Sequence, residues 1–148
     1  MIRGAAICDP PSGHTRPNRI IGAGGDDTLT GGAGNDTYLF DADLVLGADT
    51  INESGGGVDT LDFSATTNSN LAINLANASV QTVAAGFLTL NLSANNTIEN
   101  VIGGSLHDGL TGNSLNNRLI GGPGNDTYNF DADLSLGSDT INESGGGV

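Results

Sequence analysis

The sequence predicts an all-β fold, a β-solenoid of short parallel strands, from three observations. Glycine recurs every nine residues over two parts of the chain, which holds 24 glycines in 148 residues. Each nine-residue unit ends in a short run with an apolar residue at its centre, which is typical of a half-buried strand. Between the two parts, residues 71–83 and 87–102 alternate apolar and polar side chains. No stretch of useful length has the period of an amphipathic helix.

The nine-residue units divide into a turn and a strand. The first set starts at Gly13 and reads "GHTRPNRII", "GAGGDDTLT" and "GGAGNDTYL"; the second starts at Gly103 and reads "GGSLHDGLT", "GNSLNNRLI" and "GGPGNDTYN". Gly stands first in each unit, Asp or Asn sixth, and Ile, Leu or Tyr eighth. Because glycine permits positive φ, the first six residues can curl into a turn, and the eighth side chain of the following strand points inward. Stacked units should form a flattened coil with two parallel sheets and polar turns at both edges.

A longer repeat sets the predicted organisation. Residues 121–148 repeat residues 31–58 at an offset of 90 positions, with four differences. The chain ends just before the residue equivalent to Asp59. We therefore expect a fragment of a longer repetitive protein. The predicted segments are a poorly ordered N-terminal tail (1–12), a first array (13–62), a strand-rich connecting solenoid segment (63–102) and a second array (103–148).

Charge and composition exclude several classes of protein. The formal net charge is −13, with no lysine and four arginines, so the basic patch that nucleic acids and anionic membranes require is absent. No apolar run is long enough to span a membrane, and the N-terminal residues lack the apolar core of a secretory signal. A single cysteine, Cys8, cannot form an internal disulfide. An acidity of this degree favours solubility or recruits cations.

The sixth residues of the units predict a cation site. Each coil takes two units, so turns at one edge belong to alternate units, and their carboxylates should stack. Stacked carboxylates repel unless a positive charge lies between them, and the chain has few cationic side chains to supply it. The predicted pairs are Asn18 with Asp36, Asp36 with Asp59, Asp27 with Asp49, Asp108 with Asp126, and Asn117 with Asp139.

Calcium fits these pairs best among common metal ions. Ca²⁺ accepts six to eight carboxylate and carbonyl oxygens with flexible geometry, whereas Mg²⁺ demands an octahedron. Zinc is disfavoured because Cys8, His14 and His107 form no cluster of suitable spacing. Asp is also a common turn former, so a purely structural role for these residues remains the alternative.

The units "GGAGNDTYL" and "GGPGNDTYN" resemble the calcium-binding nonapeptide of RTX, or haemolysin-type, proteins, G-G-x-G-x-D-x-U-x. The resemblance implies a right-handed parallel β-roll of nonapeptide repeats, here as two short arrays joined by a strand-rich segment. It also implies that backbone carbonyls complete each calcium site. The candidates for these carbonyls are Gly31, Ala33, Gly121 and Pro123.

The sequence leaves three functions open. The first is a calcium-dependent structural module of a secreted or cell-surface protein, exported by type I secretion machinery. The second is the C-terminal folding module of an exported protease or lipase. The third is part of a surface adhesin, with outward threonines such as Thr28 and Thr37 forming a binding face. No residues form a recognisable catalytic site, so we expect no enzymatic activity from this chain. His107 is expected to be a solvated loop residue.

Overall fold

The computed structural model describes residues 16–130 and 136–143. Every regular element among them is a strand, and most are three residues long. In order they are β1 (Arg19–Ile21), β2 (Thr28–Leu29), β3 (Thr37–Leu39), β4 (Gly47–Ile51), β5 (Thr60–Asp62), β6 (Ala72–Asn74), β7 (Gln81–Ala84), β8 (Leu88–Leu92), β9 (Asn100–Ile102), β10 (Gly109–Thr111), β11 (Arg118–Ile120), β12 (Thr127–Asn129) and β13 (Thr140–Asn142). The predicted N-terminal tail, with Cys8 and His14, lies outside the described residues.

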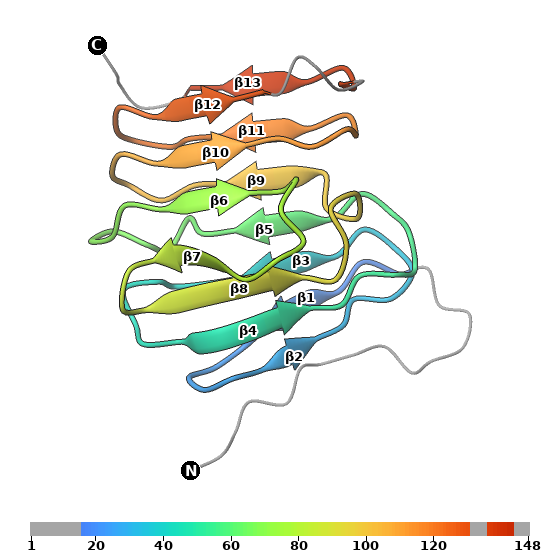
Figure 1. Cartoon of the computed structure of the whole chain (residues 1–148), viewed down its shortest axis with the longest axis horizontal. Coiled ribbons are helices and arrows are strands. Elements are labelled where there is room, and N and C mark those ends of the chain that lie inside the picture. The colour runs from blue at the N-terminus through green and yellow to red at the C-terminus, as the bar shows by residue number, and fades with distance from the viewer. Residues whose placement is uncertain (1–15, 131–135, 144–148) are drawn as a thin grey trace.

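The strands stack into a coil with two faces (Figure 1). One face is a six-stranded parallel sheet in the order β1-β3-β5-β9-β11-β13. The other face consists of a three-stranded sheet, β12-β10-β6, and a four-stranded sheet, β2-β4-β8-β7. Strands of the two faces run in opposite directions in Figure 1, β7 excepted. The predicted all-β parallel roll is confirmed.

One part of the fold departs from the prediction. We expected two wholly parallel sheets, but β7 pairs with β8 antiparallel, with an irregular register between Thr82 and Ala84. The short loop that joins β7 to β8 explains the difference, because it can form a hairpin but cannot form the long crossover that parallel neighbours need. Strand β7 is the edge strand of the four-stranded sheet and packs against β6 of the three-stranded sheet (Figure 1).

The core is the apolar seam between the two faces. The central residue of most short strands is buried, as in β1, β3, β5, β9 and β11, where it is Ile20, Tyr38, Leu61, Val101 and Leu119. This residue is the eighth of the predicted unit wherever the unit is regular. Towards the C-terminal end of the coil burial decreases: Tyr128 of β12 is half-buried and Ile141 of β13 is exposed. Phe40 and Phe63 stack inside the coil with ring centroids 5.1 Å apart. Such a thin seam buries little apolar area per residue, so turn contacts at the edges must contribute to stability.

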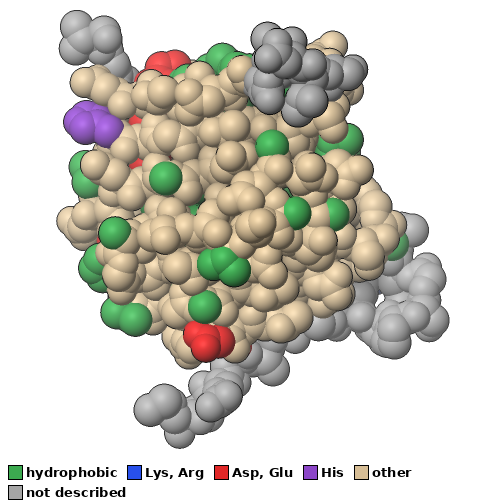
Figure 2. All heavy atoms as spheres, viewed as in Figure 1, with side chains coloured by type: hydrophobic (Ala, Val, Ile, Leu, Met, Phe, Trp, Pro, Cys, Tyr) green, Lys and Arg blue, Asp and Glu red, His purple; other side chains and the backbone are tan. Residues whose placement is uncertain are grey.

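The surface is less acidic than the composition suggests. Figure 2 shows apolar side chains scattered singly over one face, with few carboxylates between them. Several of the 17 acidic residues are instead buried: Asp36, Asp49, Glu53, Asp59 and Asp108. Among residues 16–130 and 136–143, no helix has the length and apolar character needed to traverse a lipid bilayer.

Candidate metal centre

Polar residues form a ladder along one edge of the six-stranded sheet. Each stands two positions before the central residue of its strand, where the chain leaves a turn. The carboxylate of one residue accepts a hydrogen bond from the backbone N–H of the ladder residue in the neighbouring turn. These bonds run from Asn18 to Asp36 (2.7 Å), from Asp36 to Asp59 (2.8 Å), from Asp59 to Glu99 (2.7 Å) and from Asn117 to Asp139 (2.9 Å).

The other predicted pairs are joined in the same way. The N–H of Asp27 donates to Asp49 Oδ1 (2.9 Å), and the N–H of Asp108 donates to Asp126 Oδ1 (2.8 Å). All five predicted pairs are therefore neighbours in space. The contact between them differs from the expected one, because a carboxylate meets an amide rather than another carboxylate. The cause is the turn itself, whose last N–H would otherwise lack a partner.

Each of these bonds uses one oxygen of the accepting carboxylate. Asp108 differs, because its two oxygens accept the N–H groups of Leu71 and Gly104. The Oδ2 atoms of Asp36, Asp49 and Asp126 are buried and have no hydrogen-bond partner among the described residues. Burial raises the pKa of Asp49 to about 6, and the nearby charges of Asp27 and Asp26 act in the same direction. Buried polar atoms are almost always paired, so each of these oxygens needs an explanation. A bound cation satisfies a carboxylate oxygen in such a place, and a proton does so when no cation is bound.

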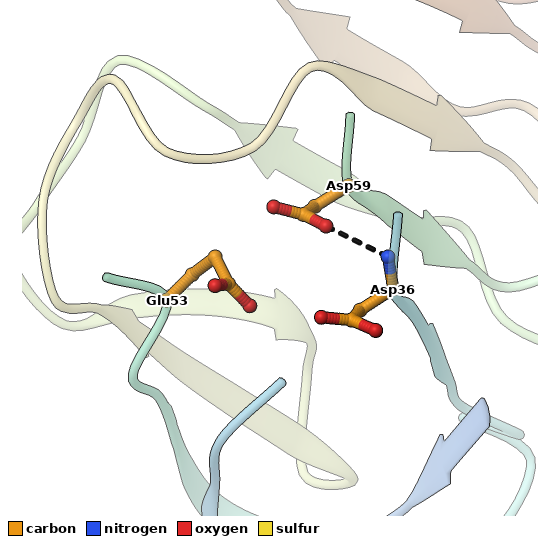
Figure 3. A group of neighbouring side chains, drawn as sticks. All are labelled: Asp36, Glu53 and Asp59. Atoms are coloured by element: carbon orange, nitrogen blue, oxygen red, sulfur yellow. Dashed lines mark hydrogen bonds between the residues drawn. The ribbon is translucent and has the colours of Figure 1, made fainter. Parts of the chain in front are cut away.

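Asp36, Glu53 and Asp59 form the densest group of carboxylates in the described part of the chain (Figure 3). One oxygen of each lies within 4.8 Å of the other two, and the side chains are at most 2 % exposed. Figure 3 shows Glu53 approaching from the opposite side of the turn, with its carboxylate turned toward the two aspartates. Burial raises the pKa of Asp59 to about 7, with the charges of Glu53, Glu99 and Asp36 adding to the effect. Burial also raises the pKa of Glu53.

Sequence reasoning missed Glu53 and Glu99. Glu99 precedes buried Val101 by two positions, the same spacing that separates Asp36 from Tyr38, so the position could have been found by counting back from the apolar residue. The nine-residue motif offers no such signal for Glu53. Its indication is the longer repeat, which places Glu143 90 residues later in the same context.

Gly31 leaves the space in which this group assembles. A Cβ atom there would lie 2.5 Å from Asp36 Oδ2 and 2.7 Å from the Tyr38 hydroxyl, and closer still to Glu53. Gly121 stands in the same relation to Asp126 and Tyr128. The predicted carbonyl of Gly31 accepts a bond from Asn18 Nδ2 (3.2 Å).

The remaining predicted carbonyls belong to the tops of two turns. Ala33 lies between Gly32 and Gly34, and Pro123 lies between Gly122 and Gly124. These four glycines have φ between 90° and 141°, as the curled turn requires.

The two asparagines of the ladder use their amide groups for protein contacts. Asn117 Nδ2 donates to the carbonyl of Glu99 (3.0 Å) and to Asn113 Oδ1 (3.0 Å), and its own Oδ1 accepts the N–H of Asn113 (2.7 Å). A neutral amide adds no charge that a cation would need to balance. Asn18 and Asn117 are thus satisfied in a way that the buried aspartate oxygens are not.

Comparison with known families agrees with this architecture. Residues 50–145 match the model described as peptidase M10 serralysin C terminal, which covers well over half of the chain. Residues 12–43 match the RTX calcium-binding nonapeptide repeat (4 copies). No curated protein and no solved structure matched the chain. RTX nonapeptide repeats bind calcium, so calcium is the cofactor of this chain. The chain therefore belongs to the family of serralysin C-terminal domains and carries the calcium-binding nonapeptide repeats of RTX proteins.

Proposed function

We propose that calcium ions bind between the stacked turns of this roll and that their binding drives its folding. The proposed ligands are the carboxylates of the paired turns, at Asp36/Asp59, Asp27/Asp49 and Asp108/Asp126. At the Asn117/Asp139 pair, Asp139 supplies the single carboxylate, so this site should be weaker. The proposed additional ligands are the backbone carbonyls of Gly31, Ala33, Gly121 and Pro123. The observation that carries the proposal is the set of buried Oδ2 atoms of Asp36, Asp49 and Asp126, which lack any partner in the described residues.

The chemistry of the site favours calcium over other common ions. The donors are carboxylate and carbonyl oxygens, which hard cations prefer. The turns bring these donors from two chain segments whose spacing depends on folding, so a flexible coordination sphere suits them better than the octahedron of Mg²⁺. The absence of lysine from the chain leaves few internal charges to compete with the ion.

Folding then depends on the calcium concentration. Extracellular calcium modules have dissociation constants of roughly 10⁻⁴ to 10⁻³ M. At about ten times the dissociation constant, each site contributes roughly 1.4 kcal/mol to the folded state, so several sites together can decide whether the chain folds. The chain would stay expanded where calcium is scarce and fold outside the cell, where calcium is abundant. This fits a module of a secreted or cell-surface protein that leaves through type I secretion machinery.

A calcium titration followed by circular dichroism and calorimetry tests the proposal. We expect a coil spectrum in chelator and a β spectrum in millimolar calcium, with heat released in step with folding. Asp36→Asn and Asp27→Asn should each raise the calcium midpoint, because each removes one charged ligand from a different edge. A β spectrum that is unchanged between chelator and calcium would refute the coupling of binding to folding.

A second proposal concerns the protein of which this roll is a module. The match to a serralysin C-terminal domain favours an exported peptidase as the host over a lipase or an adhesin. The zinc-binding sequence H-E-x-x-H in the same reading frame would support the peptidase, and a G-x-S-x-G element would support a hydrolase of the lipase type. Assay of the full-length product against casein and a lipid ester distinguishes the two.

A further inference from the structure

Glu53 stands where the neighbouring turn has a glycine. The turn between β4 and β5 begins at Glu53 and ends at Asp59, and it stacks on the turn that begins at Gly31 and ends at Asp36. Because Gly31 has no side chain, Glu53 can reach down into the space between the two turns. Its carboxylate therefore comes from the end of the four-stranded sheet, whereas those of Asp36 and Asp59 precede strands of the six-stranded sheet.

Two hydrogen bonds hold the Glu53 side chain in this place. The Tyr38 hydroxyl donates to Oε2 (2.5 Å), and the N–H of Gly55 donates to Oε1 (3.3 Å). Tyr38 is completely buried. The hydroxyl proton of Tyr38 makes this group the donor of the bond and the Glu53 carboxylate its acceptor. A charged carboxylate is the acceptor that such a bond stabilises most.

A similar contact recurs 90 residues later, where Tyr128 is half-buried and Glu143 is exposed. The Tyr128 hydroxyl donates to Glu143 Oε2 (2.5 Å), and Asp126 again has a buried Oδ2 without a partner in the described residues. Gly121 leaves the space, as Gly31 does. The tyrosine, the glutamate and the glycine thus occur together in both copies of the longer repeat.

We propose that Glu53, oriented by Tyr38, is a third carboxylate ligand of the cation site between Asp36 and Asp59, and that this site has the highest calcium affinity in the roll. The inference rests on the proposed function, which it extends to a residue outside the nonapeptide motif. Asp36 is 1 % exposed and its unpartnered Oδ2 lies in the same group as a Glu53 oxygen. A third negative ligand strengthens a calcium site, because affinity follows the number of charged ligands. The Asp27/Asp49 pair has no such third carboxylate among the described residues.

Tyrosine-sensitised terbium luminescence tests the proposal at this one site. Tb³⁺ is a hard cation that takes the same oxygen ligands as Ca²⁺, and it emits when a nearby tyrosine absorbs. The chain has two tyrosines and no tryptophan, so Tyr128→Phe leaves Tyr38 as the single antenna. In that background we compare Glu53→Gln with Asp62→Asn. Both remove one charge, but Asp62 lies on β5 facing away from the buried seam. The amide oxygen that Glu53→Gln introduces can still accept the bond from the Tyr38 hydroxyl.

The expected result is a selective loss of affinity. Glu53→Gln should raise the dissociation constant for Tb³⁺ at the Tyr38 site, and the Ca²⁺ concentration that displaces it, by about tenfold or more, whereas Asp62→Asn should change both by less than about twofold. Tyr38→Phe, measured by calcium calorimetry because it lacks the antenna, should weaken the tightest class of sites while leaving the charge unchanged. If Glu53→Gln does not fold in saturating calcium, the calcium affinity of Tyr38→Phe tests the inference in its place.

The outcomes separate this inference from the proposed function. If Glu53→Gln folds and binds as tightly as its parent, or if Tyr38→Phe leaves the tightest class unchanged, Glu53 is a structural partner of Tyr38 and the inference is wrong, even though the roll still folds with calcium. If the unmodified chain binds neither Ca²⁺ nor Tb³⁺, the proposed function itself fails.

Discussion

In the absence of calcium, protonation of buried carboxylates should stabilise the folded roll. The pKa of Asp59 lies near 7 in the folded chain, against an ordinary value of 3.8. Between these two values the folded state binds more protons than the unfolded state, so the free energy of unfolding falls as the pH rises. Acidification of calcium-free protein from pH 7.5 to pH 4.5 should therefore promote folding. The neighbours that face Asp59 are Asp36, Glu53 and Glu99, and all are acidic, so none of them opposes this effect when ionised.

The magnitude follows from the size of the shift. One pKa unit corresponds to about 1.4 kcal/mol, so a shift of roughly three units makes Asp59 responsible for up to about 4 kcal/mol across the whole window. Asp59 is 1 % exposed, so water screens little of this energy. A change of this size is comparable with the total stability of many small domains. The metal-free chain should thus pass from mostly unfolded to substantially folded as the pH falls.

Chemical denaturation in metal-depleted buffer, followed by circular dichroism from pH 4.5 to 7.5, measures this change. Asp59→Asn should flatten the pH dependence, whereas Asp62→Asn, which removes the same charge from the outward face of β5, should leave most of it. In saturating calcium the slope should reverse, because protons then compete with the ion for the carboxylates. If the free energy of unfolding of the metal-free chain stays constant or rises with pH, folding does not raise the pKa of Asp59. The electrostatic reasoning would then fail.

Three further predictions concern packing and metal removal. Gly31→Ala should destabilise the calcium-bound roll by about 1–3 kcal/mol, because the new Cβ would collide with the carboxylates of Asp36 and Glu53. Gly109→Ala should destabilise it far less, because the nearest atom to its Cβ would be 3.8 Å away. Thermal unfolding in calcium measures both variants. Phe63→Ala should cost about 3–5 kcal/mol by opening a cavity beside Phe40, read from denaturant midpoints. Addition of excess chelator to the folded chain should return the coil spectrum and expose the backbone to proteolysis within the same calcium range.

Regular units made most of the fold predictable. Where a unit keeps Gly first and an apolar residue eighth, as around Tyr38 and Leu119, the strand falls on the last three residues and its centre is buried. This prediction succeeds because a turn of six residues followed by a strand of three fixes which side chain of the strand points inward. The spatial pairing of the aspartates follows from the same geometry, since alternate turns share an edge.

The hairpin and the two glutamates were not predictable in the same way. In the connecting segment, alternation identified β7 and β8 as strands but contained no information about their relative direction, which the short loop between them determines. Glu99 escaped notice because its turn lacks glycine, although its carboxylate takes the same bond as an aspartate. Glu53 depends on a contact between turns, and its role becomes visible only when Gly31 is seen to leave room for it.

The distribution of charge along the ladder explains where calcium matters most. Its sequence of residues starts with Asn18, passes through Asp36, Asp59 and Glu99, and reaches a second neutral amide at Asn117. Three successive carboxylates thus stand in the middle of the six-stranded sheet, and Glu53 adds a fourth beside them. Neutral amides bound this group on both sides and satisfy their own hydrogen bonds, so the repulsion is confined to the middle. An ion bound there relieves the largest repulsion in the described part of the chain and joins turns from both faces of the roll. It follows that the roll should fold outward from Asp36 and Asp59, and that the turns at Asn18 and Asn117, where a neutral amide replaces one carboxylate, should depend less on the metal.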